Sequence, residues 1–255
     1  MSEQPENKKT LKQWIGEAAD WVKEIGWPSF KNGEWLFILV KRSFKSYYNN
    51  ANAEYFRRKY PRLSEDALIN KLTTIAAKNS AILGSITGAA LSADQISALI
   101  AAGPTFGLNL PAQIAIAGTA LAAEAVVLIR IQLQLIANIA KIIGVPLNPD
   151  DPEDILIILE FAFGGAGAEA VGKAGAKMAG EAAKKFIRKK ISGETLEALQ
   201  KLFAKLGVKI LQRSILKYAV PFVSAVVGAT WNYLTTVKVG GIAAHHFRKS
   251  RDERA

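Results

Sequence analysis

Two long stretches of the chain carry almost no charge, and this feature most limits what the chain can fold into. Residues 79–129 contain two charged side chains, Asp94 and Glu124, and residues 218–237 contain none. A run of about 20 apolar residues is long enough to cross a bilayer as a helix. Proline, glycine and amide residues interrupt both stretches, however, and the central helices of a soluble bundle are also apolar all round. The pattern favours buried core helices, with membrane-spanning helices as the alternative.

The spacing of apolar residues indicates helices throughout. Over residues 10–26 they recur at three- and four-residue steps, with charged residues opposite them. No stretch shows the two-residue alternation that is typical of a strand. The sequence therefore predicts an all-α fold, a single multi-helix globular bundle with apolar central helices and an amphipathic N-terminal helical arm. We expect the Trp-rich arm at residues 1–33, the helical domain at 34–247 and a charged C-terminal tail at 248–255.

Capping residues predict several helix boundaries. Residues 34–60 are expected to form one long helix or two short ones. Ser64 suits the N-cap of a helix that runs to about residue 82, where glycines begin to interrupt the chain. A long helix is predicted over residues 111–143, because Gly144 follows it as a suitable C-terminal residue.

The positive charge of the chain is concentrated in two segments. The formal net charge is +11, of which residues 31–62 carry +6 and residues 184–217 carry +8, so the remainder is slightly acidic. Local basicity favours a binding surface for an anionic partner, whereas the plain alternative is two solvated helix faces. Lys201, Lys205 and Lys209 repeat every four residues, so we expect them to form one ridge along a helix.

Aromatic residues are interleaved with basic ones near the N-terminus. Tryptophan rings suit the headgroup level of a membrane, and basic residues suit anionic lipid headgroups. The alternative, favoured for Trp21, is that the tryptophan rings dock the arm on the core. No nucleic-acid-binding motif accompanies these residues, so nucleic acid is not expected as a partner. The predicted lipid-binding residues are Trp14, Trp21, Trp27, Trp35, Lys41, Arg42, Lys45, Arg57, Arg58, Lys59, Lys184, Lys185, Arg188, Lys189, Lys190, Lys201, Lys205 and Lys209.

Residues for catalysis or metal binding are scarce. The chain has no cysteine, and its two histidines, His245 and His246, are neighbours that do not share a helix face. The four carboxylates of residues 150–154 fit the N-terminus of a helix better than a calcium loop. No catalytic motif is complete. The sequence therefore predicts no catalytic residue, no metal site and no cofactor, and it favours a non-enzymatic protein.

Polar residues recur at particular places within the apolar helices. Residues 124–144, followed by the acidic residues 150–154, and the later run at 221–236 resemble the EcsC family of bacterial proteins. The resemblance extends over residues 54–247. The family takes its name from a gene cluster that contains an ABC transporter, so the resemblance implies a membrane-linked role. The family has no established biochemical activity, and the resemblance therefore implies no reaction.

The resemblance also draws attention to polar residues in helices that should be buried. Glu124 and Arg130 are six positions apart, so they cannot meet on one helix face. We favour a hydrogen-bond network that sets the helix register, and the alternative is a polar point inside a lipid-holding cavity. The predicted buried polar residues are Glu124, Arg130, Gln132, Gln134, Asn232 and Thr236.

These features together predict a membrane-associated protein that binds anionic membrane lipid, with lipid held in an apolar cavity as a further expectation. The start of the chain lacks the apolar segment of a secretory signal, so we expect a cytoplasmic protein at the periphery of the cytoplasmic membrane. One alternative is an adaptor whose basic helix at residues 182–217 docks on an acidic protein partner. Another is a helical protein that inserts into bilayers.

Overall fold

A computed structural model describes residues 10–91, 112–148, 206–211 and 224–253, together with Asp151, Asp154, Ile158, Ala204, Ser214 and Tyr218. The described residues contain helices and no strand, which confirms the predicted all-α fold. The helices are α1 (Leu11–Asn32), α2 (Glu34–Asn50), α3 (Ala53–Lys59), α4 (Glu65–Ala90), α6 (Ala112–Ile143) and α12 (Ser224–Asp252).

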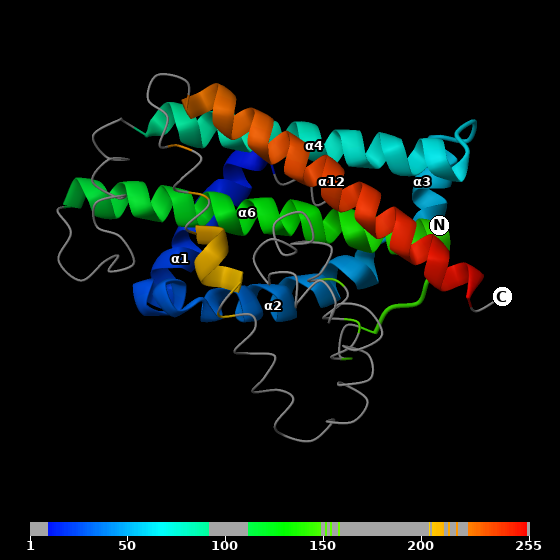
Figure 1. Ribbon diagram of the computed structural model, residues 1–255, viewed down its shortest axis with the longest axis horizontal. Helices are drawn as coiled ribbons and strands as arrows, with labels where there is room; N and C mark the ends of the chain where they lie inside the picture. Colours follow the sequence, from blue (N-terminus) through cyan, green and yellow to red (C-terminus); the bar gives the residue numbers. More distant parts are fainter. Residues whose placement is uncertain are drawn as a thin grey trace.

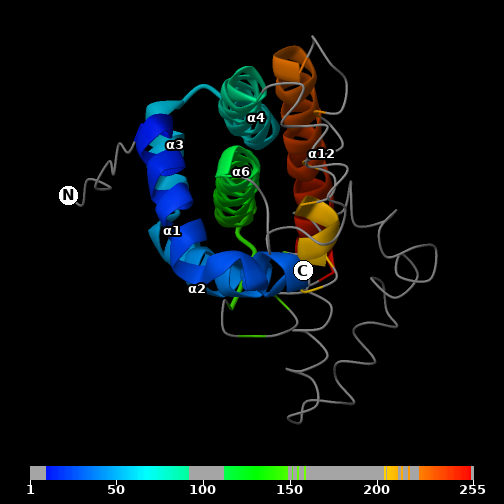
Figure 2. The same cartoon turned by 90° about the vertical axis from the view of Figure 1, so that its left-hand side faces the viewer.

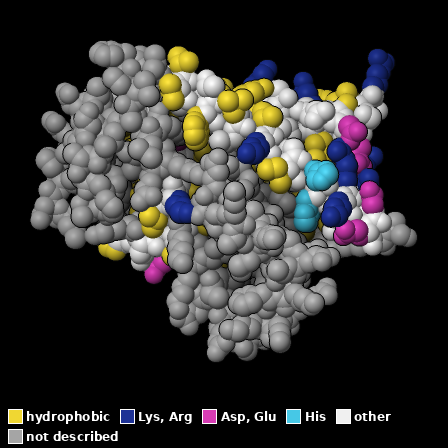
Figure 3. Space-filling view, viewed as in Figure 1, with side chains coloured by type: hydrophobic (Ala, Val, Ile, Leu, Met, Phe, Trp, Pro, Cys, Tyr) yellow, Lys and Arg dark blue, Asp and Glu magenta, His cyan; other side chains and the backbone are white. Residues whose placement is uncertain are grey.

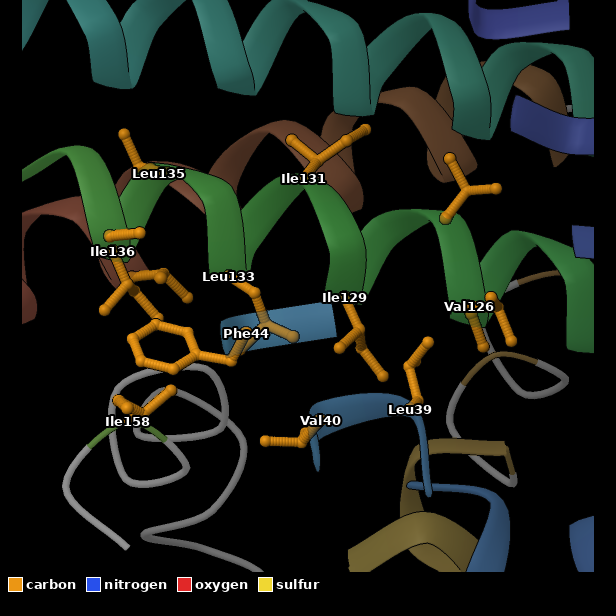
Figure 4. Packing of buried hydrophobic residues seen from close by; sticks show 14 of the residues in the cluster. Leu39, Val40, Phe44, Val126, Ile129, Ile131, Leu133, Leu135, Ile136 and Ile158 are labelled. Carbon is orange, nitrogen blue, oxygen red and sulfur yellow. The ribbon is translucent and has the colours of Figure 1, made fainter. Parts of the chain in front are cut away.

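Helix α6 lies at the centre of the bundle, as Figures 1 and 2 show. It lies between α2 and α4, and it also packs on α1 and α12. Its side chains are buried on nearly all sides, which explains why its sequence is apolar all round. In Figure 4, Ile129 and Leu133 of α6 point toward Leu39, Val40 and Phe44 of α2. The second apolar region of the sequence lies mostly in α12, beside α6.

The length and apolar character of α6 also meet the requirement for a membrane span. Ala117–Ile143 is the only such helix among the described residues. However, 72% of its most apolar window is buried inside the protein, as expected for the core helix of a bundle.

Helix α1 is the described part of the predicted N-terminal arm, and it packs on α6. Thr10 and Gln13 form a capping box, in which each side chain accepts a hydrogen bond from the backbone of the other residue. The chain kinks at Gly26, where φ is 73° and ψ is 159°. The helix then resumes through Pro28 to Asn32, beyond the end that the apolar pattern predicts, because proline fits the first turn after a break.

Residues 34–60 form the two shorter helices, α2 and α3, and Asn52 caps the second of them by accepting a hydrogen bond from the Tyr55 N–H. Ser64 caps α4 through the Ala67 N–H, as expected. The predicted end of α4 near residue 82 is wrong, since the helix continues through its glycines to Ala90. The helix continues past residue 82 because its glycines pack closely against α12.

Candidate functional site

Helices α4 and α12 run antiparallel and approach each other closely at glycine residues. A Cβ atom built on Gly228 of α12 would lie 2.6 Å from the carbonyl oxygen of Gly84 in α4. A Cβ atom built on Gly240 would lie 2.5 Å from Thr73 Oγ1. Real Cβ atoms essentially never approach so closely, so glycine is required on the inner face of α12. The packing that glycine permits also keeps α4 helical beyond the predicted end.

Glu124 lies where α4, α6 and α12 meet, and its side chain is 1% exposed. Its Oε1 atom accepts hydrogen bonds from the Tyr218 hydroxyl and from the Asn232 side-chain amide, both at 2.8 Å. The Tyr218 hydroxyl also lies 3.1 Å from the carbonyl oxygen of Gly84. A carboxylate is tolerated in a protein core when it is hydrogen-bonded. This cluster therefore ties α6 to both neighbouring helices.

A second polar cluster lies further along the same interface. Thr236 Oγ1 of α12 donates a hydrogen bond to Ser80 Oγ of α4 at 2.9 Å and accepts one from Gln132 Nε2 of α6 at 3.4 Å. All three side chains are buried. The two clusters lie at successive levels of one three-helix interface, so a shift of any helix would break bonds at both levels.

Two of the polar residues that were expected in the core lie elsewhere. Arg130 is half-buried, and its positive charge acts on Tyr47 of α2, where it opposes the larger effect of burial, which raises the pKa of Tyr47. Gln134 is exposed, so the prediction that it is buried is wrong. An apolar sequence around a residue does not ensure burial, because even a central helix keeps a narrow face toward solvent.

Tyr218 has a raised pKa, first because of burial and then because of the nearby charge and hydrogen bond of Glu124. An unfolded tyrosine ionises near pH 10, so above that pH the unfolded chain loses a proton that the folded protein keeps. The stability that Tyr218 contributes is therefore complete below about pH 10 and is lost as the pH rises further.

We expect Tyr218→Phe to lower the unfolding free energy at neutral pH by about 1–2 kcal/mol, because a buried hydrogen bond is lost. The fall of unfolding free energy above about pH 10 should become shallower than in the wild type, since one titrating group is removed. Urea denaturation at neutral and alkaline pH measures both effects. Equal alkaline slopes in the two proteins would contradict the pKa assignment.

The structure places two of the predicted lipid-binding tryptophans in the core. Trp21 is 5% exposed and Trp35 is 0% exposed. Phe30 packs between them, stacked on Trp35 at 5.1 Å and edge-on to Trp21 at 6.2 Å between ring centroids. These two rings dock the chain on the core and are not available to a lipid surface. Trp14 is half-buried, and the side chain of Trp27 lies outside the described part.

The basic residues of α2 and α3 lie on the surface, as the lipid-binding prediction requires. Lys41, Arg42 and Lys45 of α2 and Arg57, Arg58 and Lys59 of α3 are all exposed. Arg57 also has a structural role, since its guanidinium donates a hydrogen bond to the Ile142 carbonyl at the end of α6, at 3.2 Å. Figures 1 and 2 show that α2 lies on the opposite side of α6 from α4.

The second basic segment is described only in part. Lys209 is exposed within the helical residues 206–211. The remaining predicted residues lie outside the described part of the chain, and they are Lys184, Lys185, Arg188, Lys189, Lys190, Lys201 and Lys205.

The structure also reveals an apolar surface that the sequence interpretation missed. Val226, Trp231, Leu234 and Val237 of α12 are 67%, 47%, 59% and 38% exposed, and Lys238 lies exposed beside them. We call these five residues the α12 outer face. Figure 3 shows hydrophobic side chains over this part of the molecule, with Lys and Arg among them. The interpretation of residues 218–237 as a core helix concealed the face, although apolar and polar positions alternate at helical spacing in this stretch.

The C-terminal end of α12 carries charged and histidine side chains instead of exposed apolar ones. A surface hollow there is lined by His245, Arg248, Lys249, Asp252 and Glu253, whose charges do not suit a lipid acyl chain. Figure 3 shows the histidines and the mixed charges at this end. Within the described part of the chain, no group of His, Cys, Asp and Glu side chains is arranged to hold a metal ion.

A central apolar helix, α6, that is linked by buried polar clusters to α4 and α12, which run antiparallel to each other, places the protein in the class of all-α helical bundles. The family model of the EcsC protein family matches residues 112–251, more than half of the chain, so the chain belongs to the EcsC family. The match covers α6 and nearly all of α12, and with them Glu124, Gln132, Tyr218, Asn232 and Thr236, whereas the α4 members of the two polar clusters, Ser80 and Gly84, lie outside it. No curated protein and no solved structure matches the chain.

Proposed function

We propose that this protein binds anionic lipid surfaces as a peripheral membrane protein and that the α12 outer face is its contact surface. The observation that carries the proposal is the exposure of four large apolar side chains, including Trp231, along one side of a single helix. Scattered apolar residues on a surface need no partner, but a row of them on one helix is typical of an interaction site. A tryptophan beside a lysine suits the headgroup level of a membrane.

The charge of α12 favours an anionic partner. Its basic residues are Lys238, Arg248, Lys249 and Arg251, and its only acid is Asp252. Arg248 and Arg251 are ion-paired with Asp66 and Glu65 of α4, so Lys238 is the basic residue that lies beside the exposed apolar side chains. A basic residue near an anionic lipid surface contributes about 1 kcal/mol, and each partly exposed apolar side chain contributes a similar amount when it leaves water. The two effects together are sufficient for reversible binding.

We expect Leu234→Gln to weaken binding to vesicles of phosphatidylcholine and phosphatidylglycerol by roughly tenfold, because an exposed apolar side chain of the α12 outer face becomes polar. Flotation with these vesicles measures the bound fraction. Ile38→Gln is the matched control, since Ile38 is 38% exposed but lies on α2, and it should change binding less than about twofold.

Two further measurements separate this proposal from its alternatives. Binding should fall as salt or the fraction of neutral lipid rises, because charge attraction contributes to it. If Lys41→Glu on α2 abolishes binding and Leu234→Gln does not, the α2–α3 surface is the contact and the proposed surface is wrong. Binding that ignores both salt and lipid charge would contradict the electrostatic part of the proposal. The adaptor alternative remains a prediction, because most of residues 182–217, on which it rests, lie outside the described part of the chain.

A further inference from the structure

Small and polar side chains form the contact between α4 and α12. Gly84 and Gly228 touch at one end, Ser80 and Thr236 are hydrogen-bonded in the middle, and Gly240 lies against Thr73 beyond them. Helices in water usually bury their largest apolar side chains against each other. Helices in lipid instead pack through small residues and interhelical hydrogen bonds, because lipid already solvates the apolar side chains.

The outer sides of both helices carry the large apolar residues. On α4, Ile82 and Ile86 are each two positions from Gly84, and two positions turn a helix by about 200°. They therefore lie on the side of α4 away from α12, where they are 52% and 45% exposed. By the same spacing Val226 lies opposite Gly228, on the side of α12 away from α4. The pair thus has an apolar exterior on both sides and a polar seam between them.

Most of the exposed apolar residues of the pair lie toward one end. Starting from that end, the first charged residue on α4 is Lys78 and the first on α12 is Lys238. The opposite end is held by ion pairs of Arg248 with Asp66 and of Arg251 with Glu65, the latter at 3.1 Å. All acidic residues of α4 and α12 lie at this charged end together with Lys71, Arg248, Lys249 and Arg251, so this end cannot enter hydrocarbon without a large desolvation cost, whereas the apolar end can.

The length of the apolar end corresponds to one leaflet. Twelve residues separate Lys78 from the end of α4, which is about 18 Å of helix, and about 21 Å separates Lys238 from the start of α12. One leaflet contributes about 15 Å of hydrocarbon. Lysine side chains at this boundary reach the phosphate level with their charged groups while their stems stay apolar. Glu124 lies within this end, but it is buried and hydrogen-bonded.

We infer that the α4–α12 pair enters a single leaflet of an anionic bilayer by its Gly84–Gly228 end, with lipid against both outer sides and with Lys78 and Lys238 at the headgroups. This inference rests on the proposed function and adds the depth and direction of the contact. It differs from a helix lying flat on its α12 outer face, in which Ile82 and Ile86 stay in water. In the leaflet arrangement the outer sides of both α4 and α12 contact lipid, whereas in the flat arrangement only the outer side of α12 does. Probes on the two outer sides therefore distinguish the two arrangements.

The chain has no cysteine, so single cysteines can carry an environment-sensitive fluorophore without further changes. Ile86→Cys and Val226→Cys label the two outer sides of the apolar end, and Asp66→Cys labels the charged end. We expect bound protein on phosphatidylcholine–phosphatidylglycerol vesicles to show a blue-shifted emission and quenching by bromolipids at both Ile86 and Val226. The emission of the fluorophore at position 66 should stay as it is in water, and bromolipids should not quench it. Helical circular dichroism checks that each labelled variant is folded.

The outcomes separate the inference from the proposed function. Quenching at Val226 without quenching at Ile86 would overturn entry into the leaflet and leave surface binding in place. Quenching at Asp66 as deep as at Ile86 would also overturn it, because the charged end would then be embedded. Failure of the unlabelled protein to float with the vesicles would overturn the proposed function itself.

Discussion

Replacing Gly84 with alanine is expected to lower the unfolding free energy by about 3 kcal/mol, at the upper end of the usual cost of overpacking. The added methyl group would lie well within the van der Waals contact distance of the Gly228 carbonyl oxygen. That oxygen belongs to backbone, which cannot rotate away as a flexible side chain can. The two helices must therefore separate, and separation also lengthens the hydrogen bonds at Glu124 and Thr236.

Thermal unfolding followed by circular dichroism measures the effect, which corresponds to a fall in Tm of roughly 6–12 °C for a chain of this length. Gly16→Ala is the matched control. Gly16 is exposed within α1 and a Cβ atom there has nothing within 4 Å, so alanine should raise stability by about 0.5–1 kcal/mol. Equal stability of Gly84→Ala and the wild type would show that the glycine contact is not needed.

The second large effect is expected from Glu124→Ala, which should lower the unfolding free energy by about 3–5 kcal/mol. The substitution removes the acceptor for Tyr218 and Asn232, both of which are 0% exposed and out of reach of bulk water. Each buried hydrogen bond that is lost costs about 1–3 kcal/mol, and the missing side chain leaves a cavity as well. This loss is a large part of the total stability of an ordinary domain.

Chemical denaturation of Glu124→Ala beside Glu124→Gln tests this expectation. Glutamine keeps an oxygen that accepts both hydrogen bonds, so its loss should be clearly smaller. Gln134→Ala is a control on the same helix, where an exposed side chain should change stability by less than about 0.5 kcal/mol. If alanine and glutamine at position 124 are equally destabilising, the hydrogen bonds to Tyr218 and Asn232 do not account for the role of Glu124.

Local features of the fold could be predicted because they depend on neighbours in the sequence. Ser64 caps α4 through the Ala67 N–H, and Gly144 follows α6 with φ of 83°, a conformation that favours glycine. The end of α4 could not be predicted in this way. From the sequence alone, the glycines of α4 predict the end of the helix. They belong to a packed helix because Gly228, which is distant in the sequence, lies against Gly84.

The candidate site was predicted in part, for a similar reason. Polar residues within apolar helices pointed to Glu124 and Asn232, but Tyr218 lies in a region read only as apolar. No local spacing reveals that its hydroxyl reaches Glu124, which is 94 positions away. The tryptophan-rich start of the chain suggested membrane contact, whereas Trp21 and Trp35 are buried. Composition shows that a residue prefers an apolar environment, but it does not show whether lipid or the protein's own core supplies that environment.

The sequence alone determined that the chain is all-α, where most helices begin, and that its charge and its apolar residues are segregated. These properties follow from periodicity and capping, which act over a few residues. Tertiary structure decided which side of each apolar helix is covered. Residues 79–90 and 224–237 look alike in the sequence, yet each has one side against its partner and one side in solvent. A helix that is apolar all round does not specify which side its neighbour covers, so only the long-range packing at Gly84, Gly228 and Glu124 distinguishes core from exposed surface.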